Sequence, residues 1–143
     1  MTQNSLYIKM RGVTLLELMI VVVVIAIIVT VAIPNYFEFS ARAKRAEAKS
    51  ALLQIATNQE RQYLQNNQYT TDMSRLGFED AGCNTSGSGA YTICVPDADA
   101  NTFTATATWI LGGTEEDKCG VFQIDGRGVK RSTPDTDCWT RTR

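Results

Sequence analysis

Histidine is absent from this chain of 143 residues, and its absence excludes several common kinds of site. Without imidazole there is no Ser-His-Asp triad, no Cys-His nucleophile pair, no histidine general base and no histidine ligand for zinc. Carboxylate pairs or a lysine remain as routes to catalysis, but no motif brings such groups together. We therefore expect a protein that is not an enzyme, with no catalytic residues, no bound metal and no cofactor.

An excess of charge of either sign is also missing. The chain has 14 basic and 15 acidic residues, which leaves a formal net charge of −1. Such a balance does not indicate a surface for nucleic acid or another polyanion. The length suits one modest folded domain in addition to any membrane segment.

A long apolar run is present near the start of the chain. Residues 13–33 contain one charged side chain, Glu17, and as a helix they are roughly 32 Å long, which matches about 30 Å of bilayer hydrocarbon. Lys9 and Arg11 precede the run, so the positive-inside rule places the N-terminus in the cytoplasm. The run therefore predicts a single membrane pass, with everything after Pro34 outside the cytoplasm.

Two other interpretations of this run stay open. Residues 30–32 could form the small-residue cleavage site of a secretory signal, although the apolar stretch is long for one. The run could also be a plain anchor in which Glu17 snorkels to the interface. A more specific interpretation follows from cleavage after Gly12. The new α-amine of Val13 would lie one helical turn from Glu17 and would be largely protonated at neutral pH, so it could pair with its own Glu17 or with a neighbour's.

The residues around this point resemble the N-terminal motif of the type IV prepilin and pseudopilin family. The resemblance rests on a basic leader ending in Gly12, then Val13, a Thr-Leu-Leu-Glu sequence ending at Glu17, an apolar stretch and Pro34. It implies cleavage between Gly12 and Val13 by a prepilin peptidase, N-methylation of Val13, and pairing of Glu17 with a neighbouring subunit during assembly. The implied domains are a leader at 1–12, a transmembrane half-helix at 13–33 and a periplasmic or extracellular head at 34–143.

The pattern after Pro34 predicts that the helix continues to about Asn66, with a kink or local break at the proline. Asn66, Asn67 and Gln68 favour its end. One face of this helix, expected to pack on a sheet, is assigned to residues at helical spacing. These residues are Tyr36, Phe39, Ala43, Ala46, Ser50, Leu53, Ala56 and Tyr63.

Strands are expected in the second half of the chain. A glycine- and serine-rich loop at 82–89 precedes candidate strands at 90–95, 102–111 and 120–124, and a short return strand near Val129 follows the hairpin dipeptide at Asp125. The long helix with three or four antiparallel strands predicts an α+β fold. The family resemblance implies the pilin ladle architecture with a C-terminal disulfide loop.

Four cysteines fall in the part expected to face an oxidising compartment, where an even number indicates two disulfides. Three pairings are possible. We expect the pairing in sequence order, Cys83 with Cys94 and Cys119 with Cys138, because it closes two short loops. Residues around the last two cysteines and residues 59–63 and 67–70 further resemble PilE-like minor pilins.

The resemblance implies a structural subunit of a type IV pilus, a PilE-like minor pilin that acts in pilus assembly and twitching motility. A major pilin and a type II secretion pseudopilin are the alternatives. Its partners would be other pilin subunits in a helical filament, the prepilin peptidase and the inner-membrane assembly machinery. The expected location is the inner membrane, as a single pass with a cytoplasmic N-terminus, and then the extracellular pilus.

A DNA-binding pilin for natural transformation is an alternative of another class, because basic side chains in the last part of the chain could contact phosphates. These are Arg127, Lys130, Arg131, Arg141 and Arg143. Two further clusters have simpler interpretations. The basic residues 42, 44, 45 and 49 are expected to be a solvated helix face or a headgroup contact. The acidic residues 115–117, 135 and 137 are expected to be solvated rather than calcium ligands.

Overall fold

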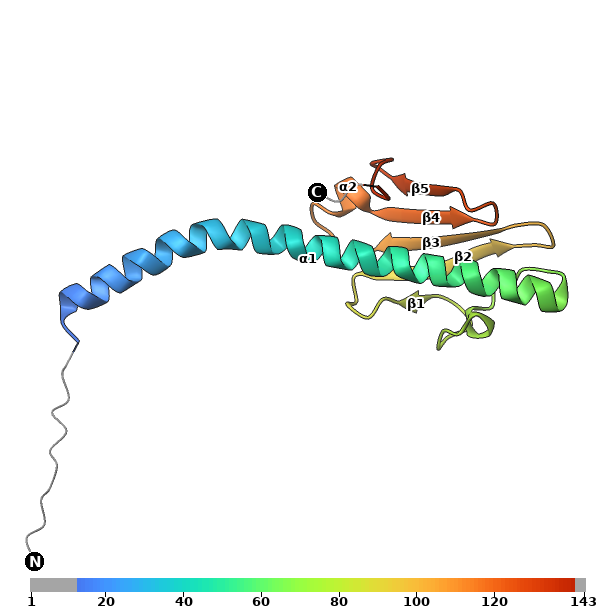
Figure 1. Ribbon diagram of the computed structural model, residues 1–143, viewed down its shortest axis with the longest axis horizontal. Helices are drawn as coiled ribbons and strands as arrows, with labels where there is room; N and C mark the ends of the chain where they lie inside the picture. The colour runs from blue at the N-terminus through green and yellow to red at the C-terminus, as the bar shows by residue number, and fades with distance from the viewer. Residues whose placement is uncertain (1–12, 141–143) are drawn as a thin grey trace, which may run out of the picture. The chain divides into compact units, whose positions relative to one another are not determined.

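The structure, a computed structural model, describes residues 13–140. Two compact units are present, one ending at Glu38 and the other covering Phe39–Arg143. The α+β fold class is confirmed (Figure 1). The elements are α1 (Leu15–Asn66), a 3-10 turn η1 (Met73–Leu76), β1 (Asn84–Thr85), β2 (Tyr91–Ala98), β3 (Phe103–Trp109), α2 (Glu116–Cys119), β4 (Val121–Asp125) and β5 (Lys130–Thr133).

Helix α1 has nearly the predicted bounds. It ends at Asn66, where Asn67 adopts the left-handed conformation with φ 52° and donates its backbone N–H to the Tyr63 carbonyl at 2.8 Å. Asparagine tolerates this conformation better than most residues, so it stops a helix. The helix is not interrupted at residue 34. The local break at Pro34 is therefore wrong, while the kink stays a prediction.

The five strands of the head unit form one antiparallel sheet in the order β1-β2-β3-β4-β5. The alternation predicted for residues 102–111 is confirmed, because Phe103, Ala105, Ala107 and Trp109 are buried on one face of β3. The register of β2 shifts between Cys94 and Asp97. Pro96 lies in this interval, and a proline has no N–H to donate to the ladder.

One strand was not predicted. Within the expected loop at 82–89, residues 84–85 form β1, which pairs with β2 through Asn84 opposite Ile93. The Cys83–Cys94 disulfide, with Cα atoms 4.5 Å apart, holds the start of β1 against β2. A glycine- and serine-rich segment has little strand propensity, so this covalent tie explains what propensity did not indicate.

The face of α1 that packs on the sheet is also not the predicted one. Ala48, Leu52 and Ile55 are fully buried in one cluster with the inner residues of the strands. Most of the predicted face is exposed instead, including Phe39 and Leu53. Alanines on several sides of this helix allow more than one apolar stripe, so the sequence pattern did not fix its rotation.

Gln59 extends the buried stripe by one turn and is itself fully buried. Its side-chain amide accepts from the Thr70 N–H at 3.0 Å and donates to the Thr70 carbonyl at 2.6 Å. The amide therefore bonds to both backbone groups of Thr70, in the way that a residue of a neighbouring β-strand does. This full pairing is what allows a polar side chain in the core.

The β4–β5 turn is longer than the predicted two-residue hairpin. Lys130 is opposite Ile124, and Gly128 adopts φ 75°. The Asp125 carboxylate accepts the N–H groups of Arg127 and Val129, both at 3.0 Å. Asp125 therefore shapes the turn through its side chain, instead of occupying a central turn position.

Candidate functional site

The start of α1 is the first candidate site. Leu15 begins the helix, and the Thr14 hydroxyl accepts the Glu17 N–H at 3.2 Å, which makes Thr14 its N-cap. Val13 consequently precedes the helix, and the one-turn spacing between the Val13 amine of the cleaved chain and Glu17 stays a prediction. Val13 and Glu17 are both exposed, and Gly12 lies outside the described residues.

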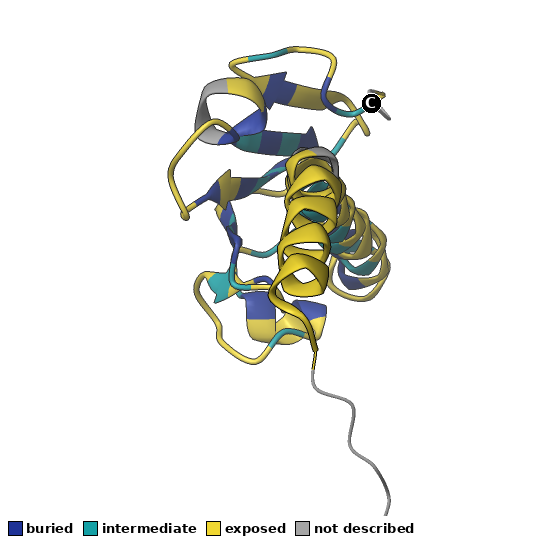
Figure 2. Cartoon of the chain, turned by 90° about the vertical axis from the view of Figure 1, so that its left-hand side faces the viewer, coloured by how far each residue is buried: buried dark blue, intermediate teal, exposed yellow. Residues whose placement is uncertain are grey.

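The first unit displays an apolar surface around this acid. Every described residue from 13 to 30 is exposed, and Glu17 is the charged residue among them (Figure 2). The Thr30 hydroxyl donates to the Ile27 carbonyl at 2.7 Å, so this polar group is satisfied within the helix. Within residues 13–140, no helix is both long enough and apolar enough to cross a membrane. The transmembrane role of residues 13–33 therefore stays a prediction.

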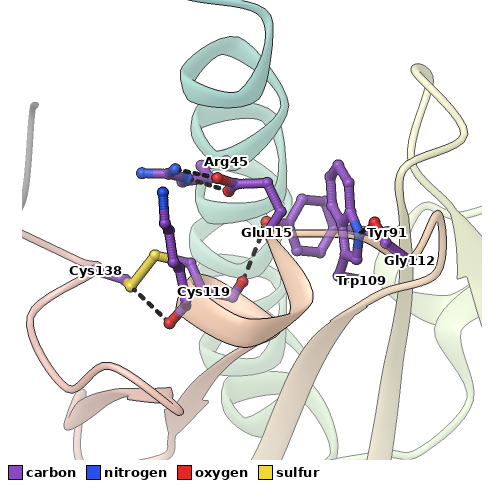
Figure 3. A network of polar contacts seen from close by, with 8 residues as sticks. Arg45, Tyr91, Trp109, Gly112, Glu115, Cys119 and Cys138 are labelled. Carbon is purple, nitrogen blue, oxygen red and sulfur yellow. Dashed lines mark hydrogen bonds and ion pairs between the residues drawn. A yellow bond between two sulfur atoms is a disulfide. The ribbon is translucent and has the colours of Figure 1, made fainter. Parts of the chain in front are cut away.

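The second candidate site lies in the head unit, where the basic cluster of α1 meets the loops of the sheet (Figure 3). The Arg45 guanidinium contacts the Glu115 carboxylate through two nitrogens, with Nε to Oε2 at 2.6 Å, and both side chains are 11% exposed. Such a two-point contact fixes orientation as well as distance. The pair ties α1 to the segment just before α2.

Two lysines of the same cluster also pack on the head instead of forming a solvated face. Lys44 Nζ lies 5.5 Å from the centre of the Trp109 ring. Lys49 Nζ donates to the Trp139 carbonyl at 3.1 Å and lies 5.4 Å from the centre of the Phe122 ring. Burial, and then the nearby Arg45 charge, lower the pKa of Lys49. The expectation of a solvated basic face is therefore wrong for Lys44, Arg45 and Lys49, while Arg42 is exposed.

The C-terminal loop is the third candidate. Cys119 and Cys138 form a fully buried disulfide with Cα atoms 5.9 Å apart, and Cys83 pairs with Cys94, so the structure has the pairing expected in sequence order. The Tyr91 hydroxyl donates to the Cys119 carbonyl at 3.3 Å. Burial, and then the Glu115 carboxylate, raise the pKa of Tyr91.

Three of the five residues considered for DNA contact are described, and all three lie at the β4–β5 edge. Arg127 and Arg131 approach the Asp125 carboxylate at 3.6 and 3.4 Å, and Lys130 Nζ lies 5.5 Å from the centre of the Trp139 ring. Two arginines thus share one carboxylate, and Lys130 packs on an aromatic ring instead. Beside them is a hollow of about 310 Å³, lined by Gln123, Lys130, Arg131, Ser132, Thr133 and Thr136. Arg141 and Arg143 lie outside the described residues.

The acidic clusters do not assemble a metal site among the described residues. Glu115 is used by Arg45, and the ligand atoms of Asp135, Asp137 and Cys138 lie within 4.8 Å of one another. Because the Cys138 sulfur is in a disulfide, it is not a thiolate ligand. What remains is a pair of loop acids.

The Arg45–Glu115 pair is the main feature that the sequence did not reveal. Its members are 70 residues apart, and no local pattern connects them. A weak signal was present. Arg45 lies on the part of the helix expected to pack, and Glu115 lies shortly before Cys119. A charged residue that is buried needs a partner of opposite charge.

Comparison with known proteins agrees with the N-terminal motif. Residues 8–33 match the prokaryotic N-terminal methylation motif. The type IV major pilin protein PilA of Myxococcus xanthus (strain DK1622) is 43% identical over 68 residues, which are 48% of this chain. The match spans only 31% of that pilin.

The head has its own matches. A type IV pilin structure from Shewanella oneidensis superposes with a TM-score of 0.51 and 25% identity, and the alignment covers 71% of this chain and 99% of that one. Residues 34–123, well over half of the chain, match the sequence model described as type IV minor pilin ComP, DNA uptake sequence receptor. Pilins of this kind are structural subunits, and this chain belongs to that type IV pilin family.

Proposed function

We propose that this pilin is a minor subunit of the type IV pilus, stored in the inner membrane through residues 13–33 and then transferred into the filament. The supporting observation is the exposed apolar surface of the first part of α1, which carries one acid, Glu17, and lies within the residues that match the methylation motif. Hydrocarbon covers this surface before assembly, and the helices of neighbouring subunits cover it afterwards. Either environment keeps the apolar side chains out of water.

Processing precedes assembly in this proposal. A prepilin peptidase cuts between Gly12 and Val13 on the cytoplasmic side, and the new amine of Val13 is methylated. The mature chain then has 12 basic side chains against 15 acidic ones, because Lys9 and Arg11 leave with the leader. Pairing of Glu17 with the amine of another subunit sets the register between neighbours, which a purely apolar helix does not specify.

Replacing Glu17 by alanine tests this role. We expect Glu17→Ala to insert into membranes and to be cleaved as before, while its amount in sheared filaments falls about tenfold or more, since a loss of about 1.4 kcal/mol is already a factor of ten. Quantitative mass spectrometry of membranes and filaments measures both. Glu79→Ala, which removes an exposed acid from the head, is the control. Normal incorporation of Glu17→Ala would refute the pairing role.

A role in DNA uptake is the second candidate function. It is supported by the sequence model that matches residues 34–123, whose description is that of a DNA uptake sequence receptor, and by the cations at the β4–β5 edge. Arg127 and Arg131 share one carboxylate, Asp125, and Lys130 lies beside them over the Trp139 ring. This edge therefore has an excess of positive charge on an otherwise mildly acidic protein. Phosphate contacts of this kind weaken steeply as salt increases.

Salt-dependent binding to duplex DNA by the detergent-solubilised chain tests the second function. We expect Lys130→Gln to weaken binding and to reduce the slope of log K against log salt by about one. Lys118→Gln, an exposed lysine in α2, is the matched control. Binding that is absent at low salt, or equal loss in both variants, would reject DNA contact at this edge.

A further inference from the structure

The loop that follows β3 presents two aliphatic side chains to solvent. We call residues 110–113 the β3 finger. Ile110 is 50% exposed and Leu111 is 54% exposed, although the preceding residue, Trp109, is buried. Two adjacent large apolar side chains at a loop tip stand out among the mostly polar exposed loops of this unit.

The β3 finger is held in a defined conformation. The Ile110 N–H donates to the Ala90 carbonyl at 3.0 Å, and the Trp109 indole N–H donates to the Gly112 carbonyl at 2.9 Å (Figure 3). Gly112 and Gly113 have φ values of 67° and 82°, which favour glycine. The backbone is thus fixed in a turn that directs Ile110 and Leu111 away from the core.

The β3 finger is attached to the first turns of α1 within the head unit. On one side of it, Lys44 lies over the Trp109 ring. On the other side, Glu115 is bound by Arg45. At the opposite end of β3, Phe103 packs on Tyr69, which follows α1. The β3 finger therefore lies at the end of the head where the unit begins.

Chain connectivity limits how far Phe39, the first residue of the head unit, can lie from the predicted membrane segment. Ile33 is the last residue of this segment, and Phe39 begins the head unit six residues later. Six residues span about 20 Å at most, even when extended. The start of the head is therefore restricted to the neighbourhood of the lipid surface for as long as residues 13–33 remain in the bilayer.

The chemistry around the β3 finger suits a lipid interface. Lys44 is the kind of residue enriched where a membrane meets water, with an apolar stem and a charged end. The Arg45–Glu115 pair at the base is neutral as a unit, so it adds no uncompensated charge. Ile110 and Leu111 supply the apolar contact, and the Lys44 ammonium supplies a partner for lipid phosphate.

We infer that the β3 finger inserts Ile110 and Leu111 into the outer surface of the membrane and holds the head against the lipid before assembly. This inference depends on the proposed membrane storage of the subunit. It adds a second contact with lipid, which must be released when the subunit moves into the filament.

Tryptophan reporters test this contact in the full-length chain. Leu111→Trp and Ile110→Trp are each reconstituted into phosphatidylcholine–phosphatidylglycerol vesicles with and without brominated acyl chains. We expect brominated lipid to cause a loss of fluorescence in both variants beyond that of the unmodified chain, which gives the signal of Trp109 and Trp139. Leu64→Trp is the matched control, because Leu64 is 83% exposed near the far end of α1, and we expect no added quenching there.

Flotation of the same vesicles distinguishes the two levels of the proposal. If the chain floats with the vesicles but the residues at 110 and 111 are quenched no more than the one at 64, the lipid contact is refuted and membrane storage stands. If the chain does not float, both are refuted. The tryptophan fluorescence of Leu111→Trp could instead change when filaments form and be unaffected by brominated lipid. That result would identify a neighbouring subunit as the partner of the β3 finger and would overturn the lipid contact.

Discussion

Thr14 and Glu17 illustrate how single residues set the start of α1. The Thr14 hydroxyl accepts the Glu17 N–H, so the helix begins one residue after Thr14. This cap separates the position of Val13 from the helix and leaves the Glu17 side chain exposed. The two residues thus have different tasks, since Thr14 caps the start of the helix and Glu17 carries the charge.

Removing the cap tests this assignment. Thr14→Val keeps the shape of the side chain but loses the acceptor, so we expect a loss of about 1 kcal/mol at the helix end. Hydrogen exchange at the Glu17 amide in the detergent-solubilised chain should then be faster. Thr14→Ser keeps the hydroxyl and should exchange at the original rate. Equal exchange in both variants would show that the hydroxyl does not cap the helix.

The Arg45–Glu115 pair joins two single residues from distant parts of the chain. Because both side chains are almost buried, removing one member leaves an uncompensated charge. We expect Arg45→Met or Glu115→Gln alone to lower the free energy of unfolding by about 3 kcal/mol, and the double variant to recover a large part of it. Urea denaturation measures all three. Additive losses would contradict direct coupling of the two side chains.

At the scale of elements, the packed face of α1 depends on Gln59 as well as on Leu52 and Ile55. Gln59→Leu leaves the N–H and carbonyl of Thr70 without their partners, so we expect a loss of about 2 kcal/mol despite the gain in apolar surface. The exposed Gln54 provides the control, because Gln54→Leu changes the same atoms without these contacts. Unfolding in urea should be unchanged for Gln54→Leu, and similar stability of both variants would refute the role of Gln59.

The stability that the β4–β5 turn contributes depends on pH through Asp125. Burial alone would raise the pKa of Asp125, but the N–H groups of Val129 and Arg127 and the charges of Arg127 and Arg131 lower it overall. A lowered pKa in the folded state contributes stability above the ordinary value of about 4, and this contribution is lost as the pH falls through the folded value. We expect the stability of Asp125→Asn to fall less steeply below pH about 4 than that of the original chain. An unchanged slope would contradict this.

The elements also show what the sequence could predict. The length of α1, the three longer strands and the sequential disulfides followed from apolar runs, alternation and short spacing. The face of α1 that packs on the sheet could not be predicted in this way, because Gln59 on that face is polar and alanines lie on several faces of the helix. Strand β1 is held by the Cys83–Cys94 disulfide, and Arg45 and Glu115 are 70 residues apart in the sequence. Neither feature has a local sequence pattern that would predict it.

At the scale of the whole molecule, the two units divide the work of a pilin. The unit ending at Glu38 provides an apolar helix with Glu17 near its start, and the unit from Phe39 provides a sheet, a packed helix and two disulfides. The first unit exposes the apolar surface that the proposed function assigns to the membrane and to other subunits. The second unit has its own core and presents the loops and the basic edge to partners.

The N-terminus of the chain recovered from sheared filaments is the most direct test of this account. Intact mass and fragment spectra should show a protein that begins at Val13, carries one methyl group on its α-amine and is present in the filament fraction. A chain that still begins at Met1, one trimmed after Ala32, or one absent from filaments would contradict it.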